Sequence, residues 1–471
     1  MKMFLSECWE DRVEKLEVIH PYDARVVDTV PRAGASDVER AILAAVEGAK
    51  RMRRTSGYDR SLILKRAAEL IEERTEDLAR TITLEEGKVI AEARFEVSRA
   101  VQTMILSAEE AKRISGEVLP LDGSPGAGNR LGFTLRVPCG VVLAISPFNF
   151  PLNLVAHKVG PALAAGNSVI LKPATHTPLS ALKLTEILLE AGLPPQAIQC
   201  LTGLGHEIGD LLCRDPRVRK ISFTGSRDVG EHICQVAGIK RVTMELGSNA
   251  PLIVMPDADL NKVAEAVAVT GYSNAGQVCI STQRVVVAKP VYEPLLERLR
   301  QRIEAITFGD PLLESVNMGP MIREKEAMRV EDWIVHARQS GARLLVGGHR
   351  KGALLEPTVV ADVQLGMSVS CEELFGPAVA VTPVETIDDG IALANDSRYG
   401  LSAGIFTENL EWAMKFAREV ESGNLHINWG PQWRADLMPY GGLKESGFGK
   451  EGPKYAIQEM TELKTVVIHL T

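Results

Sequence analysis

Long hydrophobic runs and clusters of positive charge are both scarce in this chain of 471 residues. No uninterrupted apolar stretch approaches the ~20 residues that a membrane-spanning helix requires, and prolines interrupt the longest apolar region, at 137–156. The formal net charge is -8, and no block of Lys and Arg exceeds a few residues. Because a nucleic-acid binder needs a clustered basic face, we expect neither a membrane nor a nucleic acid as a partner.

Cysteine and histidine motifs are missing as well. The seven cysteines, an odd number, show no CxxC spacing, and the nine histidines form no HExxH motif. In a chain of this length, such cysteine usage is typical of free thiols in a reducing compartment. The sequence therefore predicts a cytoplasmic protein without a metal site, and the short apolar run near the N-terminus does not resemble a secretory signal.

The composition that remains is that of a globular protein, with 45% hydrophobic and 24% charged residues. Both fractions are close to average values, so a disordered chain and a small disulfide scaffold are excluded. The length is about three times the ~150 residues of a typical domain, which predicts two or three domains.

Short apolar runs alternate with amphipathic segments from residue 139 onward. CGVVLAIS, at 139–146, is wholly apolar, as expected for a strand buried on both faces. PLNLVAHKVGPALAAG, at 151–166, follows as a helix that stops at a glycine. The alternation resumes after Glu245 with APLIVM and a helix over 258–272. This spacing predicts parallel sheets, and the fold class is therefore α/β, with two doubly wound, Rossmann-like domains.

The flanking segments follow other patterns. Ser36 or Asp37 is expected to cap an amphipathic helix, and residues 58–116 continue as helix. The segment 117–137 is rich in Pro and Gly and then β-like. The C-terminal KTVVIHLT is strand-like with no partner nearby in the sequence, so pairing with another subunit stays open.

Glycines mark two strand-to-helix turns, GLGHEIG at 203–209 and FTGSRDVG at 223–230. Backbone N–H groups at such a helix start bind phosphate, and glycine lets the phosphate approach closely. A tight turn that needs glycine would explain either one alone. Two such turns after successive parallel strands favour a dinucleotide.

Two reactive side chains occur in short polar segments, Cys279 in SNAGQVC and Glu245 in ELGSNAP. A lone cysteine is more often a small buried apolar residue than a nucleophile, and a lone glutamate at a strand end is usually solvated. Composition alone therefore does not assign either residue a chemical role.

The segments PFNFP, KPA, FTGS, ELG, GQVC, EELFGP and PYGGLKESG occur in this order across nearly the whole chain. Together they resemble the aldehyde dehydrogenase superfamily, and the chain looks most similar to lactaldehyde- and phosphonoacetaldehyde-type members. The resemblance implies a homodimer or homotetramer and three parts. These are an NAD(P)-binding domain at 1–116 and 138–247, a catalytic domain at 248–443, and β oligomerisation segments at 117–137 and 444–471.

The resemblance also implies catalytic roles. Cys279 resembles the nucleophile, whose thiolate attacks the aldehyde carbon and forms a thiohemiacetal. The Asn149 side-chain amide and the Cys279 backbone N–H are the donors that stabilise its oxyanion in the family. Glu245 resembles the general base that activates water to hydrolyse the thioester left after hydride transfer. Lys158 and Glu451 resemble positions that assist proton movement in some members.

A second group of residues resembles the NAD(P) site of the family. Lys172 resembles the residue that holds the adenine ribose, Ser226 lies in the turn that faces the pyrophosphate, and Glu373 resembles the residue that binds the nicotinamide ribose. The other residues expected along the cofactor cleft are Ile145, Pro147, Phe148, Gly205, Gly209, Phe223, Gly225, Val229 and Phe375.

Two positions depart from the family pattern. NAD-preferring members usually carry Glu three residues after the lysine, whereas this chain has Thr175. A carboxylate would repel a 2′-phosphate, while a hydroxyl tolerates one and Lys172 attracts it. We therefore expect NADP to be preferred and NAD to be usable. The usual ELGG reads ELGS, which places Ser248 near the general base.

The helix after Asn149 is expected to face the aldehyde. It carries Asn153 and His157, which are four residues apart and therefore neighbours on one helical face. By family analogy, Arg99 lies on the facing helix and Arg434 reaches the tunnel mouth. These side chains favour a short polar or anionic aldehyde, such as lactaldehyde or a sulfo- or phosphono-substituted one, because Arg grips such anions with two hydrogen bonds. A surface salt bridge for each Arg, and a core hydrogen bond for His157, are the alternatives.

Two rival functions stay open at this point. A CoA-acylating member would pass the acyl group to CoA, but such members typically lack the glutamate that Glu245 resembles. A non-catalytic relative that keeps only the fold, as in lens crystallins, conflicts with the presence of Asn149, Glu245 and Cys279 together.

Overall fold

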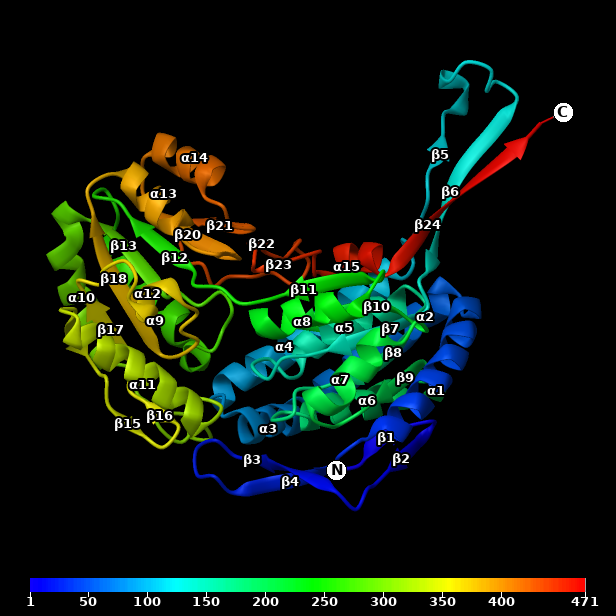
Figure 1. Cartoon of the computed structure of the whole chain (residues 1–471), viewed down its shortest axis with the longest axis horizontal. Coiled ribbons are helices and arrows are strands. Elements are labelled where there is room, and N and C mark those ends of the chain that lie inside the picture. The colour runs from blue at the N-terminus through cyan, green and yellow to red at the C-terminus, as the bar shows by residue number, and fades with distance from the viewer. Residues whose placement is uncertain (471) are drawn as a thin grey trace.

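The computed structural model describes residues 1–470. Two open sheets covered by helices make up the body of the molecule, and a long β arm projects from it (Figure 1). The α/β class predicted from the alternating pattern is confirmed.

The first sheet follows the order β2-β1-β9-β8-β7-β10-β11-β23. Its centre, from β9 to β11, is parallel, and the outer strands pair antiparallel. The strands are β1 (Met3–Leu5), β2 (Cys8–Glu10), β7 (Val141–Ile145), β8 (Ser168–Lys172), β9 (Ile198–Cys200), β10 (Val218–Thr224), β11 (Arg241–Glu245) and β23 (Gly447–Phe448).

Helices cover both faces of this sheet, which explains why its central strands are apolar throughout. Val142 and Val169 face one hydrophobic core, while Leu143 and Ile170 face the other. The first core is built with α2 (Gly57–Glu73), α3 (Thr75–Glu86), α4 (Ile90–Glu110), α5 (Asn153–Ala164) and α6 (Leu179–Glu190). The second is built with α1 (Ala35–Arg54), α7 (Gly205–Arg214) and α8 (Arg227–Ala237).

The second sheet follows the order β14-β17-β18-β13-β12-β20-β21 and is parallel except at β14. Its strands are β12 (Pro251–Val254), β13 (Arg284–Ala288), β14 (Arg343–Val346), β17 (Thr358–Ala361), β18 (Ala378–Val384), β20 (Ser402–Phe406) and β21 (Asn424–Ile427). Its two cores are built with α9 (Leu260–Tyr272), α10 (Tyr292–Glu304) and α11 (Glu324–Gln339) on one face, and with α13 (Ile387–Asn395) and α14 (Leu410–Glu419) on the other.

The β arm consists of β5 (Val118–Leu119), β6 (Arg130–Pro138) and the C-terminal β24 (Thr461–His469). β24 pairs antiparallel with β6 along its whole length, from Thr461 opposite Pro138 to His469 opposite Arg130. The C-terminal strand therefore has its partner in the same chain, more than 300 residues away, and pairing with another subunit is not needed to complete it.

Smaller elements connect these parts. They are the hairpin of β3 (Lys15–Ile19) and β4 (Val26–Pro31), the pairs β15 (Arg350–Lys351) with β16 (Leu354–Leu355) and β19 (Tyr399–Gly400) with β22 (Leu443–Lys444), the short helices α12 (Ser368–Cys371) and α15 (Pro453–Glu459), and the 3₁₀ turns η1 (Leu121–Gly123), η2 (Pro195–Ala197), η3 (Ser273–Gly276) and η4 (Lys289–Val291). No helix within residues 1–470 combines the length and the apolar character that crossing a bilayer would need.

Candidate active site

A cavity of about 610 Å³ lies between the two sheets, at the carboxyl ends of β7 and β10. Open parallel sheets commonly bind ligands at this edge. Eight of the residues predicted for the cofactor line the cavity together with Asn149 and Cys279: Pro147, Phe148, Phe223, Gly225, Ser226, Val229, Glu373 and Phe375. The predicted nucleophile, the predicted oxyanion donor and these predicted cofactor residues therefore line one cavity.

A strained turn presents the cysteine. Asn274 and Ala275 have φ angles of 50° and 52°, in the left-handed region that non-glycine residues rarely adopt. Gly276 follows with a φ of 67°, and a Cβ at that position would lie 2.1 Å from the carbonyl oxygen of Gly376. Only glycine fits there, so the turn that places Cys279 depends on this residue.

Carboxylates hold this turn against the loop that carries Asn149. The Asn274 backbone N–H donates to Glu92 Oε2 at 2.9 Å, and its side-chain amide donates to Glu86 Oε1 at 2.8 Å. That amide also donates to the carbonyl oxygen of Asn149 at 3.3 Å, and Lys88 Nζ donates to the same oxygen at 2.7 Å. One hydrogen-bond network thus positions both reactive loops.

The Cys279 sulfur lies 3.1 Å from the hydroxyl of Tyr440. Burial raises the pKa of the thiol to about 12. The resting thiol is therefore protonated at neutral pH, and a base must remove its proton before the sulfur can act as a nucleophile.

Asn149 is 3% exposed and lies on the cavity wall beside Cys279. Its Nδ2 atom donates one hydrogen bond, to the carbonyl oxygen of Gln277 at 2.8 Å. Since an amide nitrogen carries two hydrogens, this bond orients the side chain and leaves one donor for a ligand.

Glu245 ends β11 and is buried, and within residues 1–470 neither of its carboxylate oxygens has a hydrogen-bond partner. Burial, and then the neighbouring Glu451 carboxylate, raise the pKa of Glu245 well above its usual range. Gly441 runs so close that a Cβ there would lie 2.8 Å from Oε1. A carboxylate with a raised pKa and free lone pairs is suited to proton transfer.

Glu451 anchors two buried cations. Its Oε1 lies 3.0 Å from Lys158 Nζ, and its Oε2 lies 3.1 Å from a terminal nitrogen of Arg434. Although burial opposes ionisation, these two cations lower the pKa of Glu451 to about 2. Lys158 also donates to the Thr224 hydroxyl at 2.6 Å, which ties this network to the end of β10.

Three of the four residues predicted for substrate binding contact Asp436, and the fourth, Arg434, joins them through His157. Arg99 contacts both carboxylate oxygens, at 2.7 and 3.2 Å, and His157 Nε2 lies 2.8 Å from Oδ1. The Asn153 amide lies 3.4 Å from the same carboxylate. His157 Nδ1 accepts a hydrogen bond from Arg434 at 3.2 Å. The Arg99 guanidinium is thus already paired with the Asp436 carboxylate.

His157 is neutral in this network. Burial, and then the nearby Arg434 charge, lower the pKa of His157 to about 4. A neutral ring that accepts at Nδ1 must carry its proton on Nε2, and it therefore donates to Asp436. The Nε of Arg434 is buried and, within residues 1–470, has no hydrogen-bond partner. One donor of that guanidinium is left free.

The predicted adenosine end of the cofactor site lies beyond the cavity wall. Lys172 Nζ is buried and donates to the Pro173 carbonyl oxygen at 3.0 Å, and the Thr175 hydroxyl donates to the Gly203 carbonyl oxygen at 3.3 Å. Burial lowers the pKa of Lys172 to about 8. Ile145, Gly205 and Gly209 also lie outside the cavity lining, at the end of β7 and in α7.

The geometry fits a dinucleotide at the cavity. A Cβ at Gly225 would lie 2.5 Å from the Phe223 ring, so glycine suits this position in the turn before α8, and this turn lines the cavity. Glu373 accepts the Ser248 backbone N–H at 2.8 Å, and burial raises the pKa of this carboxyl to about 7. Ser248, which stands where the family pattern has glycine, therefore still donates to Glu373 through its backbone N–H. Among residues 1–470, no group of three or more His, Cys, Asp or Glu side chains is arranged to hold a metal ion.

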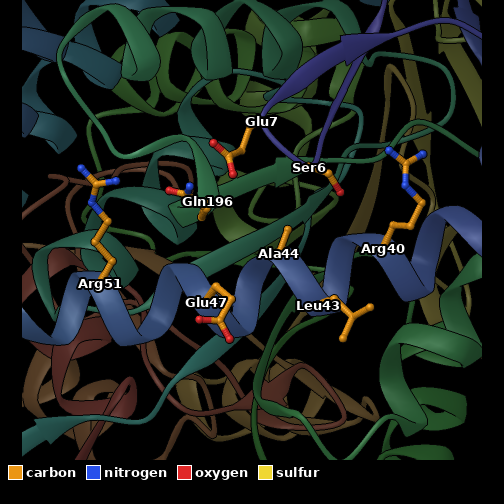
Figure 2. A pocket seen from close by; sticks show the side chains of 8 residues that line it. All are labelled: Ser6, Glu7, Arg40, Leu43, Ala44, Glu47, Arg51 and Gln196. Carbon is orange, nitrogen blue, oxygen red and sulfur yellow. The ribbon is translucent and has the colours of Figure 1, made fainter.

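A second cavity, of about 600 Å³, opens against α1 and contains no residue predicted for catalysis (Figure 2). Its Arg40 side chain is paired with Glu10 and its Glu47 with Lys50, so these charges are already compensated. The residues predicted for catalysis therefore lie at the cavity that contains Cys279.

Sequence reasoning missed two members of the site, Asp436 and Tyr440. Tyr440 stands in the quoted PYGG segment, but nothing in the sequence shows that its hydroxyl reaches the sulfur. Asp436 follows Arg434 by two residues, and its partners His157 and Arg99 are 279 and 337 residues away.

Comparison with known proteins agrees with this geometry. A model of the aldehyde dehydrogenase family matches residues 9–466. The chain is 48% identical over 468 residues to the 3-sulfolactaldehyde dehydrogenase of Priestia megaterium, covering 99% of this chain and 98% of that protein.

Solved structures show the same fold. Aldehyde dehydrogenase 21 from Physcomitrella patens, in complex with the reaction product succinate, is 39% identical with a TM-score of 0.97, covering 100% of this chain and 98% of that one. Glyceraldehyde-3-phosphate dehydrogenase GapN from Methanocaldococcus jannaschii, complexed with NADP, is 37% identical with a TM-score of 0.94, covering 97% and 100%. The chain belongs to the aldehyde dehydrogenase family, and it is an NAD(P)-dependent aldehyde dehydrogenase.

Proposed function

We propose that this enzyme oxidises a short polar or anionic aldehyde to its carboxylate, with Cys279 as nucleophile and water as the final acceptor of the acyl group. The observation that carries this proposal is that Cys279 and Asn149 line one cavity, while the buried Glu245 carboxyl lies close enough to raise the pKa of the Cys279 thiol. The three residues supply a nucleophile, an oxyanion donor and a base.

The first half of the reaction forms a covalent adduct. In its ionised form Glu245 is a strong base for a carboxylate, because burial disfavours its charge, and it takes the thiol proton. The Cys279 sulfur then bonds to the aldehyde carbon, and the carbonyl oxygen becomes an oxyanion. The free Nδ2 hydrogen of Asn149 stabilises that oxyanion, a contribution typically worth about 3 kcal/mol of the barrier.

The second half converts the adduct to product. When bound, the oxidised nicotinamide supplies the acceptor for the hydride that leaves the aldehyde carbon. Glu245 releases the thiol proton to solvent and, again ionised, removes a proton from water, whose oxygen attacks the resulting thioester. The carbon–sulfur bond breaks, the carboxylate leaves and the Cys279 thiol is restored.

The charge balance around Arg434 supports an anionic substrate. Lys158 and Arg434 contribute two positive charges against the one ionised carboxylate of Glu451, while Arg99 and Asp436 compensate each other. Arg434 also keeps its Nε donor free. The names of 3-sulfolactaldehyde dehydrogenase and of the succinate complex indicate that similar proteins handle anionic compounds.

NADP is the preferred cofactor in this proposal, with NAD usable. Thr175 places a hydroxyl where a carboxylate would repel a 2′-phosphate, and the buried Lys172 ammonium group attracts one. GapN, at 37% identity, is complexed with NADP.

Hydrolysis rather than acylation of CoA follows from the role assigned to Glu245. A base with both oxygens free can activate water, whereas transfer to CoA would need no such group. Product formation that does not depend on added CoA is the expected behaviour.

We also propose self-association through the β arm, as a homodimer or homotetramer, in a reducing cytoplasm. One face of the arm exposes Leu131, Leu135 and Ile468, each more than 40% accessible, and all seven cysteines are free thiols. In this proposal the arm belongs to the oligomerisation segments 117–137 and 444–471. The sheets belong to the NAD(P)-binding domain at 1–116 and 138–247 and the catalytic domain at 248–443.

A spectrophotometric screen of short aldehydes with NAD and NADP tests the proposal. We expect turnover of small anionic aldehydes, a higher kcat/KM with NADP than with NAD, and loss of turnover in Cys279→Ala. Cys234→Ala, which removes an exposed cysteine, is the matched control and should keep full activity. Undiminished turnover in Cys279→Ala would refute the proposed chemistry, and a hundredfold preference for NAD would refute the cofactor assignment.

A further inference from the structure

The sulfur of Cys279 has one side-chain hydrogen-bond partner among residues 1–470, the hydroxyl of Tyr440 at 3.1 Å. Tyr440 lies between Pro439 and β22 and is 3% exposed. Its ring packs in an apolar cluster with Val278 and Ile280, which flank the cysteine. The hydroxyl is therefore fixed beside the sulfur and shielded from water.

A cation lies over the face of the same ring. The guanidinium of Arg434 stacks over Tyr440, 4.0 Å from the ring centroid. Glu451 and His157 hold that guanidinium in place. A positive charge on the aromatic face withdraws electron density from the phenol and makes its O–H a stronger donor.

We infer that Tyr440 is a catalytic residue whose hydroxyl donates a hydrogen bond to the Cys279 thiolate and holds the sulfur in position until it attacks the aldehyde carbon. This inference rests on the proposed role of Cys279 as nucleophile. It adds a residue that stabilises the attacking species, a task distinct from those of Asn149 and Glu245.

The surroundings of the sulfur explain why such a donor is needed. Burial raises the pKa of the Cys279 thiol, and the carboxyl groups of Glu245 and Glu373 disfavour a second negative charge nearby. Only the Tyr440 hydroxyl and the Arg434 charge act in the opposite direction. A thiolate has no proton to donate, so in the reactive state the tyrosine must be the donor.

The size of the effect follows from the charge on the sulfur. A hydrogen bond to an ionised group changes the population of that group by about tenfold or more. The reactivity of a thiolate falls less steeply than its pKa, so the gain in thiolate population exceeds the loss in nucleophilicity. After the sulfur bonds to carbon it is uncharged and a weak acceptor, and the hydrogen bond no longer holds it.

The test is the pH dependence of alkylation by iodoacetamide, read on the Cys279 peptide by mass spectrometry. Tyr440→Phe keeps the ring and its contact with Arg434 but removes the hydroxyl. We expect the alkylation profile of Cys279 to move about one pH unit to the alkaline side, with an approximately tenfold slower reaction at neutral pH. The exposed Cys8 in the same sample should keep its profile. Tyr292→Phe, which loses a hydroxyl bonded to Asp362, is the matched variant and should resemble the wild type.

Replacing all tyrosines with a fluorinated tyrosine gives a second measurement in which every side chain keeps its hydroxyl. A more acidic phenol is a stronger donor, so the Cys279 profile should then move to the acid side. Unchanged Cys279 profiles in Tyr440→Phe and in the fluorinated protein would overturn the inference, while turnover would still be lost in Cys279→Ala. Retained turnover in Cys279→Ala would instead overturn the proposed function.

Discussion

Arg434 connects the buried charge network to the aromatic ring beside Cys279. It contacts Glu451, His157 and the face of Tyr440, and it keeps one buried donor free. A buried guanidinium with an unpaired N–H is costly unless a ligand completes it. An oxygen of a sulfonate, phosphonate or carboxylate on the substrate would meet that need.

Substitution of Arg434 should therefore separate anionic from neutral substrates. In Arg434→Ala, we expect KM for a short anionic aldehyde to rise about 10- to 100-fold, because a hydrogen bond to a charged group contributes about 1.5–3 kcal/mol. KM for a neutral short aldehyde should change little. Steady-state kinetics on both aldehydes measures the difference.

Arg99→Ala is the matched control for this prediction. Asp436 already occupies the Arg99 guanidinium in a two-point contact, so its removal should affect both aldehydes to a similar extent. An equal rise in KM for the two aldehydes in Arg434→Ala would contradict an anion-binding role.

At the scale of elements, the turn η3 has no room for a side chain at Gly276. Gly276 has a positive φ, and the Gly376 carbonyl oxygen leaves no room for a Cβ. Any side chain there must push the cysteine loop away from the strand β18 that follows Gly376. The position of the sulfur thus depends on a residue that takes no part in the chemistry.

Gly276→Ala should lower both stability and activity. We expect a loss of more than the ~1–2 kcal/mol that a left-handed residue with a Cβ costs, together with at least a tenfold fall in kcat/KM. Calorimetry and steady-state kinetics measure the two effects. Gly192→Ala is the control, since Gly192 has a φ of 93° but no neighbouring atom within 4 Å of the place that a Cβ would take. It should lose only the conformational part and keep its activity. Equal behaviour of the two variants would contradict the steric role of Gly276.

Local patterns predicted most elements of this fold. The strands and helices expected from 139 onward are present because apolar runs report burial on both faces, and the stops at Gly166 and Gly192 have the positive φ that ends a helix. The expected cap of α1 was wrong. Gly34 precedes the helix, and Asp37, in the third helical position, accepts its N–H at 3.1 Å. A carboxylate that reaches back three residues satisfies the same orphan N–H group, so the composition of the first turn does not reveal which residue caps.

At the scale of the whole molecule, the site depends on contacts that local sequence cannot report. Family motifs indicated Cys279, Glu245 and Asn149, but Asp436 joins Arg99 and His157 only because the fold brings the loop before β22 against α4 and α5. The pairing of β24 with β6 is of the same kind. Such contacts arise from burial and charge pairing in the folded chain, and no periodicity of the sequence predicts them.

The exposed apolar face of the β arm predicts self-association of the chain. Leu131, Leu135 and Ile468 lie on one face of the pair β6–β24, since Ile468 is opposite Leu131 in the ladder, and an exposed apolar sheet face is a surface that a second copy can cover. The wild-type protein should therefore have a molar mass in light scattering that is twice or four times the 51.2 kDa of one chain. Leu135→Glu combined with Ile468→Glu should reduce it to one chain, because covering this face would then remove two carboxylates from water. Leu313→Glu, at another exposed leucine, should leave the mass unchanged. A wild-type mass of one chain, or an unaltered mass in the double variant, would show that this face is not the contact between subunits.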